Sequence, residues 1–231
     1  MILEIERLRY AYPDGTAALD GVDLSLGEGE RLGLIGANGA GKSTLLLHLN
    51  GILRGEGSLR VFGIEVHRDT VARIRERVGL VFQNPDDQLF CPTVFEDIAF
   101  GPRNMRLRDD EVRRRVEKAL HAVGLGGLET RHPHRMSIGQ KKRAALATVL
   151  SMDADLLVLD EPSSNLDPRA RRELIALLQT FGRTQIMATH DLSLVRDVCT
   201  RVALLHQGRI AATGAPDEIL GNTSLLEAHG L

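Results

Sequence analysis

A glycine-rich string is the feature of this chain that most directly indicates a chemical role. It follows an apolar strand predicted from Leu32 to Ile35, precedes an apolar helix predicted from Thr44 to Leu49, and reads Gly36-Ala37-Asn38-Gly39-Ala40-Gly41-Lys42-Ser43. Glycines let consecutive backbone N–H groups form a concave anion site, toward which the positive end of the following helix points. Lys42 adds a mobile charge for β- and γ-phosphates, and the Ser43 hydroxyl suits Mg²⁺. The string therefore predicts a site for nucleotide phosphates.

Two carboxylates form a second candidate group. Asp160 and Glu161 directly follow the apolar run from Leu156 to Leu159. Ligands of open α/β sheets bind at the carboxyl ends of the strands, so we expect both side chains at such an edge. Asp160 is suited to hold Mg²⁺ through water, and Glu161 to polarise the water that attacks a γ-phosphate. An acidic turn at a strand end has the same composition, but the upstream phosphate loop favours the catalytic interpretation.

The segment Ser137-Ile138-Gly139-Gln140 precedes a helical pattern from Ala144 to Leu150. Ser137 and Gln140 fit a capping box, which accounts for these residues without any function. A helix start with a hydroxyl and a bare glycine N–H is equally suited to an anion. Both interpretations stay open on the segment alone.

Composition limits the class of protein. The chain has 231 residues, 43% of them hydrophobic. Its net charge of -2 is not the strongly positive charge of proteins that bind nucleic acid by electrostatic attraction. Nucleic acid is therefore not an expected partner. Cys91 and Cys199 fit neither a metal spacing nor a disulfide framework, which suits a reducing compartment. No stretch approaches the roughly 20 apolar residues of a membrane helix, so we expect another chain to supply any membrane span.

The distribution of strand and helix patterns predicts an α/β fold. Alternating segments up to Leu26 indicate an antiparallel β-lobe. Further strands are predicted at Val78 to Phe82, Leu156 to Leu159, Gln185 to Ala188 and Val202 to Leu205, separated by helical patterns that favour a mostly parallel sheet flanked by helices. Between Gln83 and Leu150 helices replace strands, with a capping box at Thr93 and a charged helix from about Asp109 to Val123. The run Arg113-Arg114-Arg115 is expected on a solvated helix face.

These motifs together resemble the ATPase subunit of an ABC transporter, over essentially the whole chain. Gly36 to Ser43 resembles the Walker A loop, Gln83 the Q-loop glutamine, Met136 to Gln140 the signature motif, Leu156 to Asp160 Walker B, Glu161 the catalytic glutamate, Ser164 to Asp167 the D-loop and His190 the switch histidine. The resemblance implies a P-loop NTPase core formed by residues 1–83 and 151–231, with an inserted helical lobe at 84–150, in a single domain spanning 1–231. One departure is Ile138, which stands where the family usually has the first signature glycine.

The resemblance also implies ligands. ATP is expected against the whole phosphate loop, Thr44 and Gln83, and Mg²⁺ against Ser43, Gln83 and Asp160. Tyr12 stands where the family places an aromatic ring on adenine, although Tyr10 and Tyr12 are also spaced to pack together on one strand face. Ser137, Gly139, Gln140 and Asp167 are expected to complete the ATP site of a second, identical or paralogous ATPase subunit arranged head to tail.

Within the family, the stretch from Gln83 to Pro102 resembles the ATPases of energy-coupling-factor and of cobalt or nickel importers. It implies uptake of cobalt, nickel or vitamins through integral membrane subunits that contact this region, at the cytoplasmic face of the membrane. Val94, Phe95, Ile98 and Ala99 are expected to form an apolar face, which either receives a short helix of a membrane subunit or packs within the lobe.

Rival functions within the superfamily remain. The only feature that argues against an exporter or lipoprotein-release ATPase is the resemblance of the Gln83 to Pro102 segment to importer ATPases. A DNA-repair ATPase carries a long coiled-coil insertion, and none is visible here. A translation factor normally joins two cassettes in one chain, whereas this chain has one.

Overall fold

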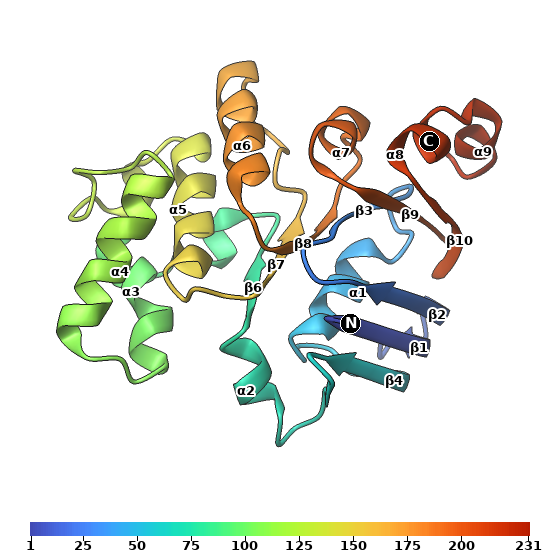
Figure 1. The fold of residues 1–231 in the computed structure, drawn as a ribbon, viewed down its shortest axis with the longest axis horizontal. Coiled ribbons are helices and arrows are strands. Elements are labelled where there is room, and N and C mark those ends of the chain that lie inside the picture. Colours follow the sequence, from blue (N-terminus) through green and yellow to red (C-terminus); the bar gives the residue numbers. More distant parts are fainter.

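The computed structural model describes residues 1–231, whose strands form two sheets (Figure 1). The smaller sheet is antiparallel, has the order β2-β1-β4-β5, and consists of β1 (Leu3–Ala11), β2 (Ala17–Leu26), β4 (Glu56–Val61) and β5 (Ile64–Glu65). The predicted antiparallel lobe is confirmed, but β4 and β5 join it from beyond the phosphate loop. Sequence reasoning missed β4 because its residues form no apolar run.

The larger sheet carries the phosphate loop. Its order is β10-β9-β3-β8-β7-β6, formed by β3 (Arg31–Ile35), β6 (Val78–Val81), β7 (Leu156–Asp160), β8 (Thr184–Ala188), β9 (Arg201–His206) and β10 (Arg209–Gly214). All strands pair in parallel except β10, which is antiparallel to β9. The predicted α/β class with a mostly parallel sheet is confirmed.

Helices lie on both sides of the larger sheet (Figure 1). One helix, α1 (Lys42–Leu49), lies between the two sheets, and α2 (Val71–Arg75) precedes β6. The others are α3 (Val94–Asn104), α4 (Asp109–Ala122), α5 (Ile138–Leu150), α6 (Pro168–Thr180), α7 (Leu192–Val198), α8 (Pro216–Leu220) and α9 (Thr223–Ala228). Helices α3, α4 and α5 pack together at one end of the molecule, where the sequence predicted helices in place of strands.

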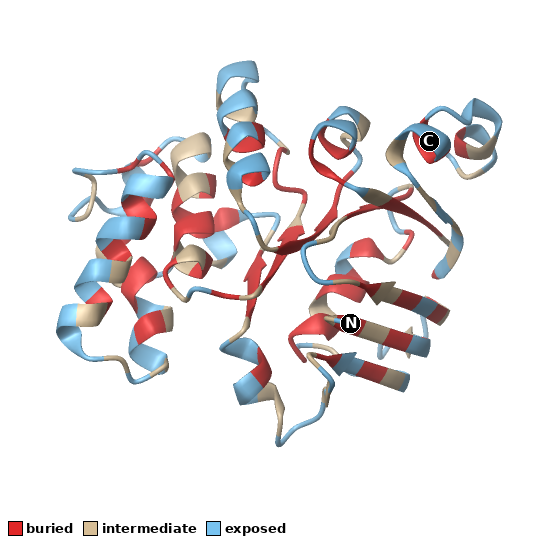
Figure 2. Ribbon diagram, in the orientation of Figure 1, coloured by how far each residue is buried: buried red, intermediate tan, exposed pale blue.

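Two hydrophobic clusters cover the two faces of the larger sheet. The central strands between them are buried (Figure 2). In β7, Leu157 and Leu159 belong to the cluster shared with α3 to α7, whereas Leu156 and Val158 belong to the cluster shared with α1 and the smaller sheet. Alternate strand residues point to opposite faces, so a strand buried on both faces must be apolar throughout. This two-sided burial explains the continuous apolar run that ends at the carboxylates.

The structure decides between the two roles left open for the apolar face on α3. Val94, Ile98 and Ala99 are fully buried in the cluster around α4 and α5, and Phe95 packs partly buried against it. The stripe of an amphipathic helix is buried first against its own neighbours, because each such side chain gains about 1.5–3 kcal/mol from burial. These residues therefore hold the helical segment together and do not form a surface for a partner.

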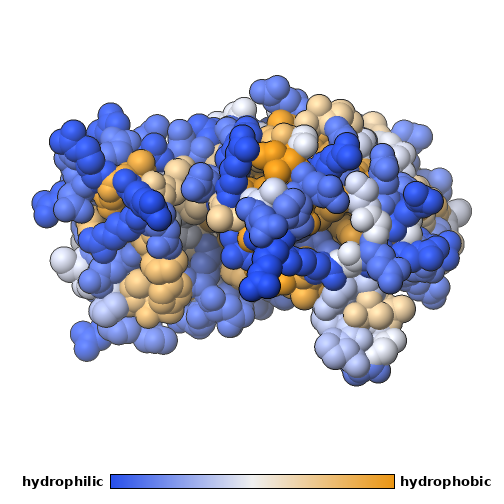
Figure 3. All heavy atoms as spheres, turned by 90° about the horizontal axis from the view of Figure 1, so that it is seen from below, coloured by the Kyte–Doolittle hydropathy of each residue, from blue (hydrophilic) through white to orange (hydrophobic).

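The Phe90 and Phe100 rings are the large apolar groups exposed between Gln83 and Pro102. Their exposed fractions are 65% and 48%, and the rings meet edge to face with centroids 5.1 Å apart. Figure 3 shows a mainly hydrophilic surface with a hydrophobic patch at the end that carries α3 and α4. None of the helices combines the length and apolar content needed to cross a membrane.

Candidate nucleotide site

The phosphate loop connects β3 to α1 through backbone conformations that require glycine. Gly36 has φ of +154°, and a Cβ there would lie 2.2 Å from the Leu205 carbonyl oxygen. Gly41 has φ of +104°, and its Cβ would lie 2.4 Å from the carbonyl oxygen of Ala18. Both distances are impossible for real atoms, so the loop closes against β9 and β2 because these positions have no side chain.

Lys42 is the buried cation of this loop. Its Nζ donates to the carbonyl oxygens of Gly36, at 2.7 Å, and Ala37, at 3.1 Å. Burial lowers the pKa of Lys42, and the nearby charges of Glu161 and Asp160 oppose that shift. The loop therefore holds a positive charge at its centre, among backbone oxygens that a stronger acceptor such as phosphate can replace.

A cavity of about 500 Å³ opens above the loop and gathers most of the predicted site residues. Its walls come from four parts of the chain that are distant in sequence: the turn after β1, the phosphate loop, the segment after β6 and the ends of β7 and β8. The lining residues are Tyr12, Thr16, Ala17, Ala18, Asn38, Gly39, Gly41, Lys42, Ser43, Thr44, Gln83, Glu161 and His190. The size suits a small organic ligand, and the lining suits an anionic one.

Glu161 is the buried carboxylate at the wall of this cavity. Its Oε2 accepts a hydrogen bond from Thr189 Oγ1 at 3.1 Å and lies 2.9 Å from His190 Nδ1. The Glu161 side chain is 8% exposed, whereas that of His190 is 63% exposed. One carboxylate oxygen is thus fixed by the two residues that directly follow β8, and the imidazole reaches from it toward solvent. The arrangement is suited to polarising a water molecule that enters the cavity.

Asp160 ends β7 beside the first residues of α1. Burial raises the pKa of Asp160, while its interaction with the Ser43 side chain opposes that shift. The Oδ1 atom is buried and has no hydrogen-bond partner. A buried carboxylate oxygen left without a donor, next to a hydroxyl, is a donor set that fits Mg²⁺, which prefers one or two protein oxygens together with water and phosphate.

Tyr12 follows β1 and lies over the start of α1. Its hydroxyl is 2.9 Å from the Thr44 Oγ1, and its ring meets the Tyr10 ring edge to face with centroids 5.1 Å apart. The alternative that the two tyrosines pack together is therefore confirmed, and Tyr12 also lines the cavity. The stacking of Tyr12 on a base stays a prediction.

The residues expected to act in trans do not line the cavity of their own chain. Ser137 and Gln140 form a complete capping box at the start of α5, so this structural expectation is confirmed. A Cβ on Gly139 would lie 3.3 Å from Ala170 Cβ in the first turn of α6, and Asp167 caps that helix. The fold thus brings the starts of α5 and α6 together, with Ile138 41% exposed beside them.

Two neighbours of Glu161 were missed by sequence reasoning. Thr189 precedes His190 and donates to the carboxylate, as described above. Lys142 on α5 is buried and donates to the carbonyl oxygens of Glu161 and Pro162. In sequence, Lys142 stands in the basic run with Lys141 and Arg143, where nothing distinguishes a buried lysine from a solvated one.

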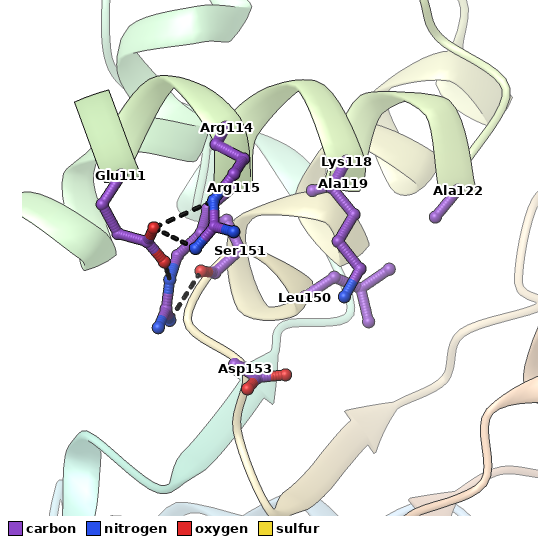
Figure 4. A pocket seen from close by; sticks show the side chains of 9 residues that line it. All are labelled: Glu111, Arg114, Arg115, Lys118, Ala119, Ala122, Leu150, Ser151 and Asp153. Carbon is purple, nitrogen blue, oxygen red and sulfur yellow. Dashed lines mark hydrogen bonds and ion pairs between the residues drawn. The ribbon is translucent and has the colours of Figure 1, made fainter. Parts of the chain in front are cut away.

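A second cavity, of about 270 Å³, lies between α4 and the end of α5 (Figure 4). Glu111 accepts hydrogen bonds from both Arg114 and Arg115. Arg115 also donates to the Met152 carbonyl at 3.2 Å, and its side chain is 24% exposed. The expectation of a solvated arginine run is therefore wrong for Arg115, which connects α4 to the turn that follows α5.

Comparisons with known proteins agree with this geometry. A family model described as ABC transporter matches residues 19–164. The energy-coupling factor transporter ATP-binding protein EcfA of Carboxydothermus hydrogenoformans is 48% identical over 235 residues, covering 100% of this chain and 87% of that protein. The solved structure of cbiO1 from Clostridium perfringens, described as part of the ABC transporter complex cbiONQ, has a TM-score of 0.86 and 40% identity, covering 98% of this chain and 93% of that one. A dimeric ATP-binding cassette bound to ADP and Pi in a post-hydrolysis state has a TM-score of 0.84 and 25% identity, covering 93% and 98%.

Proposed function

The chain belongs to the ABC transporter family as an ATPase subunit, and on that premise we propose that it powers the uptake of cobalt or nickel ions or of vitamins through separate membrane subunits. The observation that carries the proposal is the single cavity that joins the phosphate loop, Gln83, Glu161 and His190. The importer assignment is supported by the relative named EcfA and by the neighbour described as part of cbiONQ.

In the proposed site, the backbone of the phosphate loop and Lys42 bind the phosphates of ATP, and Thr44 and Gln83 contact the nucleotide. Adenine stacks on the Tyr12 ring at the mouth of the cavity, in a chain with only two tyrosines and no tryptophan. The concave N–H groups and the start of α1 favour an anion at this point. Support comes from the shared cavity that these residues line.

Ser43, Gln83 and Asp160 would hold Mg²⁺. When bound, the ion would neutralise charge on the β- and γ-phosphates. The unpartnered buried Oδ1 of Asp160 supports this role, because a divalent cation would satisfy it.

Glu161 is the proposed general base. Its carboxylate polarises the attacking water, and His190 holds the same carboxylate from the solvent side. The 2.9 Å approach of His190 Nδ1 to Glu161 Oε2 supports a joint role for these two side chains.

A second copy or a paralogous ATPase completes each site in the proposed assembly. Ser137, Gly139, Gln140 and Asp167 lie at the neighbouring starts of α5 and α6 and face the ATP of the head-to-tail partner. ATP then closes the pair because the helix start gains a phosphate partner only in the closed state, and hydrolysis removes that contact.

The membrane subunits bind the segment from Gln83 to Pro102 at the cytoplasmic face of the membrane. The exposed Phe90 and Phe100 rings support this, because an exposed apolar pair is suited to a short amphipathic helix of a membrane subunit. The segment begins at Gln83 in the nucleotide cavity, so a change at the phosphate can reach these rings along a short stretch of chain.

The test is co-purification of the chain with its membrane subunits, followed by uptake assays in vesicles containing ATP. We expect uptake of cobalt, nickel or a vitamin with the wild-type chain and none with Glu161→Gln. Phe90→Ser combined with Phe100→Ser is expected to abolish co-purification while the isolated chain retains its ATPase activity. ATP-dependent efflux, or purification without any integral membrane partner, would contradict the proposal.

A further inference from the structure

Lys142 is a buried lysine in the second turn of α5, and it contacts the loop that carries Glu161. It is 7% exposed, and its Nζ donates to Glu161 O at 2.8 Å, Ser164 Oγ at 2.8 Å and Pro162 O at 3.3 Å. An ammonium group has three N–H donors, so these contacts use its full capacity. Lys142 therefore contacts the loop and has no donor left for a nucleotide.

The backbone that Lys142 contacts is in an uncommon conformation. Glu161 has φ of +45°, in the left-handed region that residues with a Cβ rarely adopt. Such a conformation costs on the order of 1–3 kcal/mol and persists where surrounding contacts fix it. Here the Glu161 carbonyl accepts from Lys142 Nζ, from Ser164 Oγ at 2.9 Å and from the Ser164 N–H at 3.2 Å.

The electrostatics of this position also require these contacts. Burial lowers the pKa of Lys142 to about 8, and the charges of Glu161 and Asp160 oppose that shift. A buried amine is retained at a cost unless oxygen atoms surround it. Its partners are all oxygens of a single loop, so the charge is satisfied only while that loop keeps its conformation.

We propose that Lys142 is a positioning residue that fixes the backbone of Glu161 and connects it to the start of α5. The coupling part of this inference rests on the proposed function, in which Ser137 and Gly139 face the ATP of the partner subunit. Lys142 lies five residues after Ser137, about 7 Å along one rigid helix. When the start of α5 moves onto the ATP bound by the partner subunit, Lys142 moves with the helix and shifts the backbone of Glu161 in its own subunit. ATP hydrolysis in each subunit therefore depends on the nucleotides bound in both sites.

The test compares Lys142→Met with wild type and with Lys142→Arg. Methionine keeps the length and apolar stem but removes all three donors, and replacing a buried charge with an apolar side chain of similar size commonly preserves folding. We expect Lys142→Met to lower kcat about tenfold or more, because small misplacement of a catalytic group has effects of this order. ATP affinity is expected to stay within about threefold, since Lys142 does not line the cavity.

Two further readouts separate positioning from general damage. Lys142→Arg restores donors and charge, so it is expected to recover much of the kcat lost in Lys142→Met. The steepness of ATPase activity against ATP concentration is expected to fall in Lys142→Met toward that of independent sites. Lys118→Met on the exposed face of α4 is the matched control and is expected to behave as wild type.

The outcomes are distinguishable. A Lys142→Met turnover within about twofold of wild type, or a loss of ATP affinity that matches the loss of kcat, overturns the positioning role. A wild-type chain that hydrolyses ATP at full rate as a permanent monomer overturns the two-subunit site and the coupling with it. If Lys142→Met does not fold, Lys142→Leu decides, because it removes the same three donors with an apolar side chain of different shape, and unchanged kcat there overturns the role.

Discussion

His190 Nδ1 lies 2.9 Å from Oε2 of Glu161, and the two side chains differ sharply in exposure, at 63% and 8%. The carboxylate is fixed from inside by Thr189 and contacted from outside by the imidazole. The buried Glu161 carboxylate thus has one partner, His190, that faces solvent, so a ligand entering the nucleotide cavity can contact the pair through His190.

Glu161→Gln is expected to keep ATP binding and to lose most turnover, by at least about a hundredfold, because an amide cannot take a proton from water. The variant should accumulate as an ATP-bound dimer. Phosphate release measures turnover, and light scattering with ATP measures the dimer. Near-normal phosphate release would mean that the base is a different residue.

Lys42→Ala is expected to weaken ATP binding by about tenfold to a hundredfold, since it removes a charge-assisted contact of about 1.5–3 kcal/mol. Isothermal titration calorimetry measures the affinity. Lys118→Ala on α4 is the control for removing a lysine that does not line the nucleotide cavity. ATP affinity equal to wild type in Lys42→Ala would contradict the role of Lys42.

Tyr12→Ala is expected to weaken ATP binding by up to about tenfold, because an aromatic stacking contact is worth about 0.5–1.5 kcal/mol. The chain has two tyrosines and no tryptophan, so intrinsic fluorescence reports Tyr10 and Tyr12 alone. ATP should change the emission of the wild type and of Tyr10→Phe much more than that of Tyr12→Phe. A larger emission change in Tyr12→Phe than in Tyr10→Phe would mean that adenine does not stack on Tyr12.

Asp191→Asn is expected to destabilise the fold by about 2 kcal/mol at neutral pH, as expected for hydrogen bonds to a charged group. Burial alone would raise the pKa of Asp191, but hydrogen bonds from Arg171, Leu194 N–H, Ser193 and Ser163 hold it well below its usual value. A depressed pKa adds stability above the unfolded value of about 3.9, and that stability disappears as the pH falls further.

Urea unfolding of wild type and Asp191→Asn across pH 3 to 7 measures this difference. The gap in the free energy of unfolding should be largest at neutral pH and shrink below about pH 4. A gap that is independent of pH would mean that the carboxylate charge does not contribute.

Local patterns predicted the strands of the larger sheet because burial on both faces leaves an apolar run, as in β6, β7 and β8. The edge strand β10, whose residues are half-buried or exposed, carries no apolar run and was missed for that reason. The burial of Val94 and Ile98 was left open, because a helical stripe does not reveal whether it packs on its own chain or on a partner.

The sequence by itself determined the phosphate loop, the carboxylates at the end of β7 and the N-terminal cap of α5, since each depends on residues close together in the chain. The tertiary structure decided which of these residues share a cavity, that Phe90 and Phe100 are exposed together, and that Lys142 contacts the loop at Glu161. Such contacts join segments far apart along the chain, and their geometry is set by how the helices pack on the sheet, which no local spacing of residues encodes.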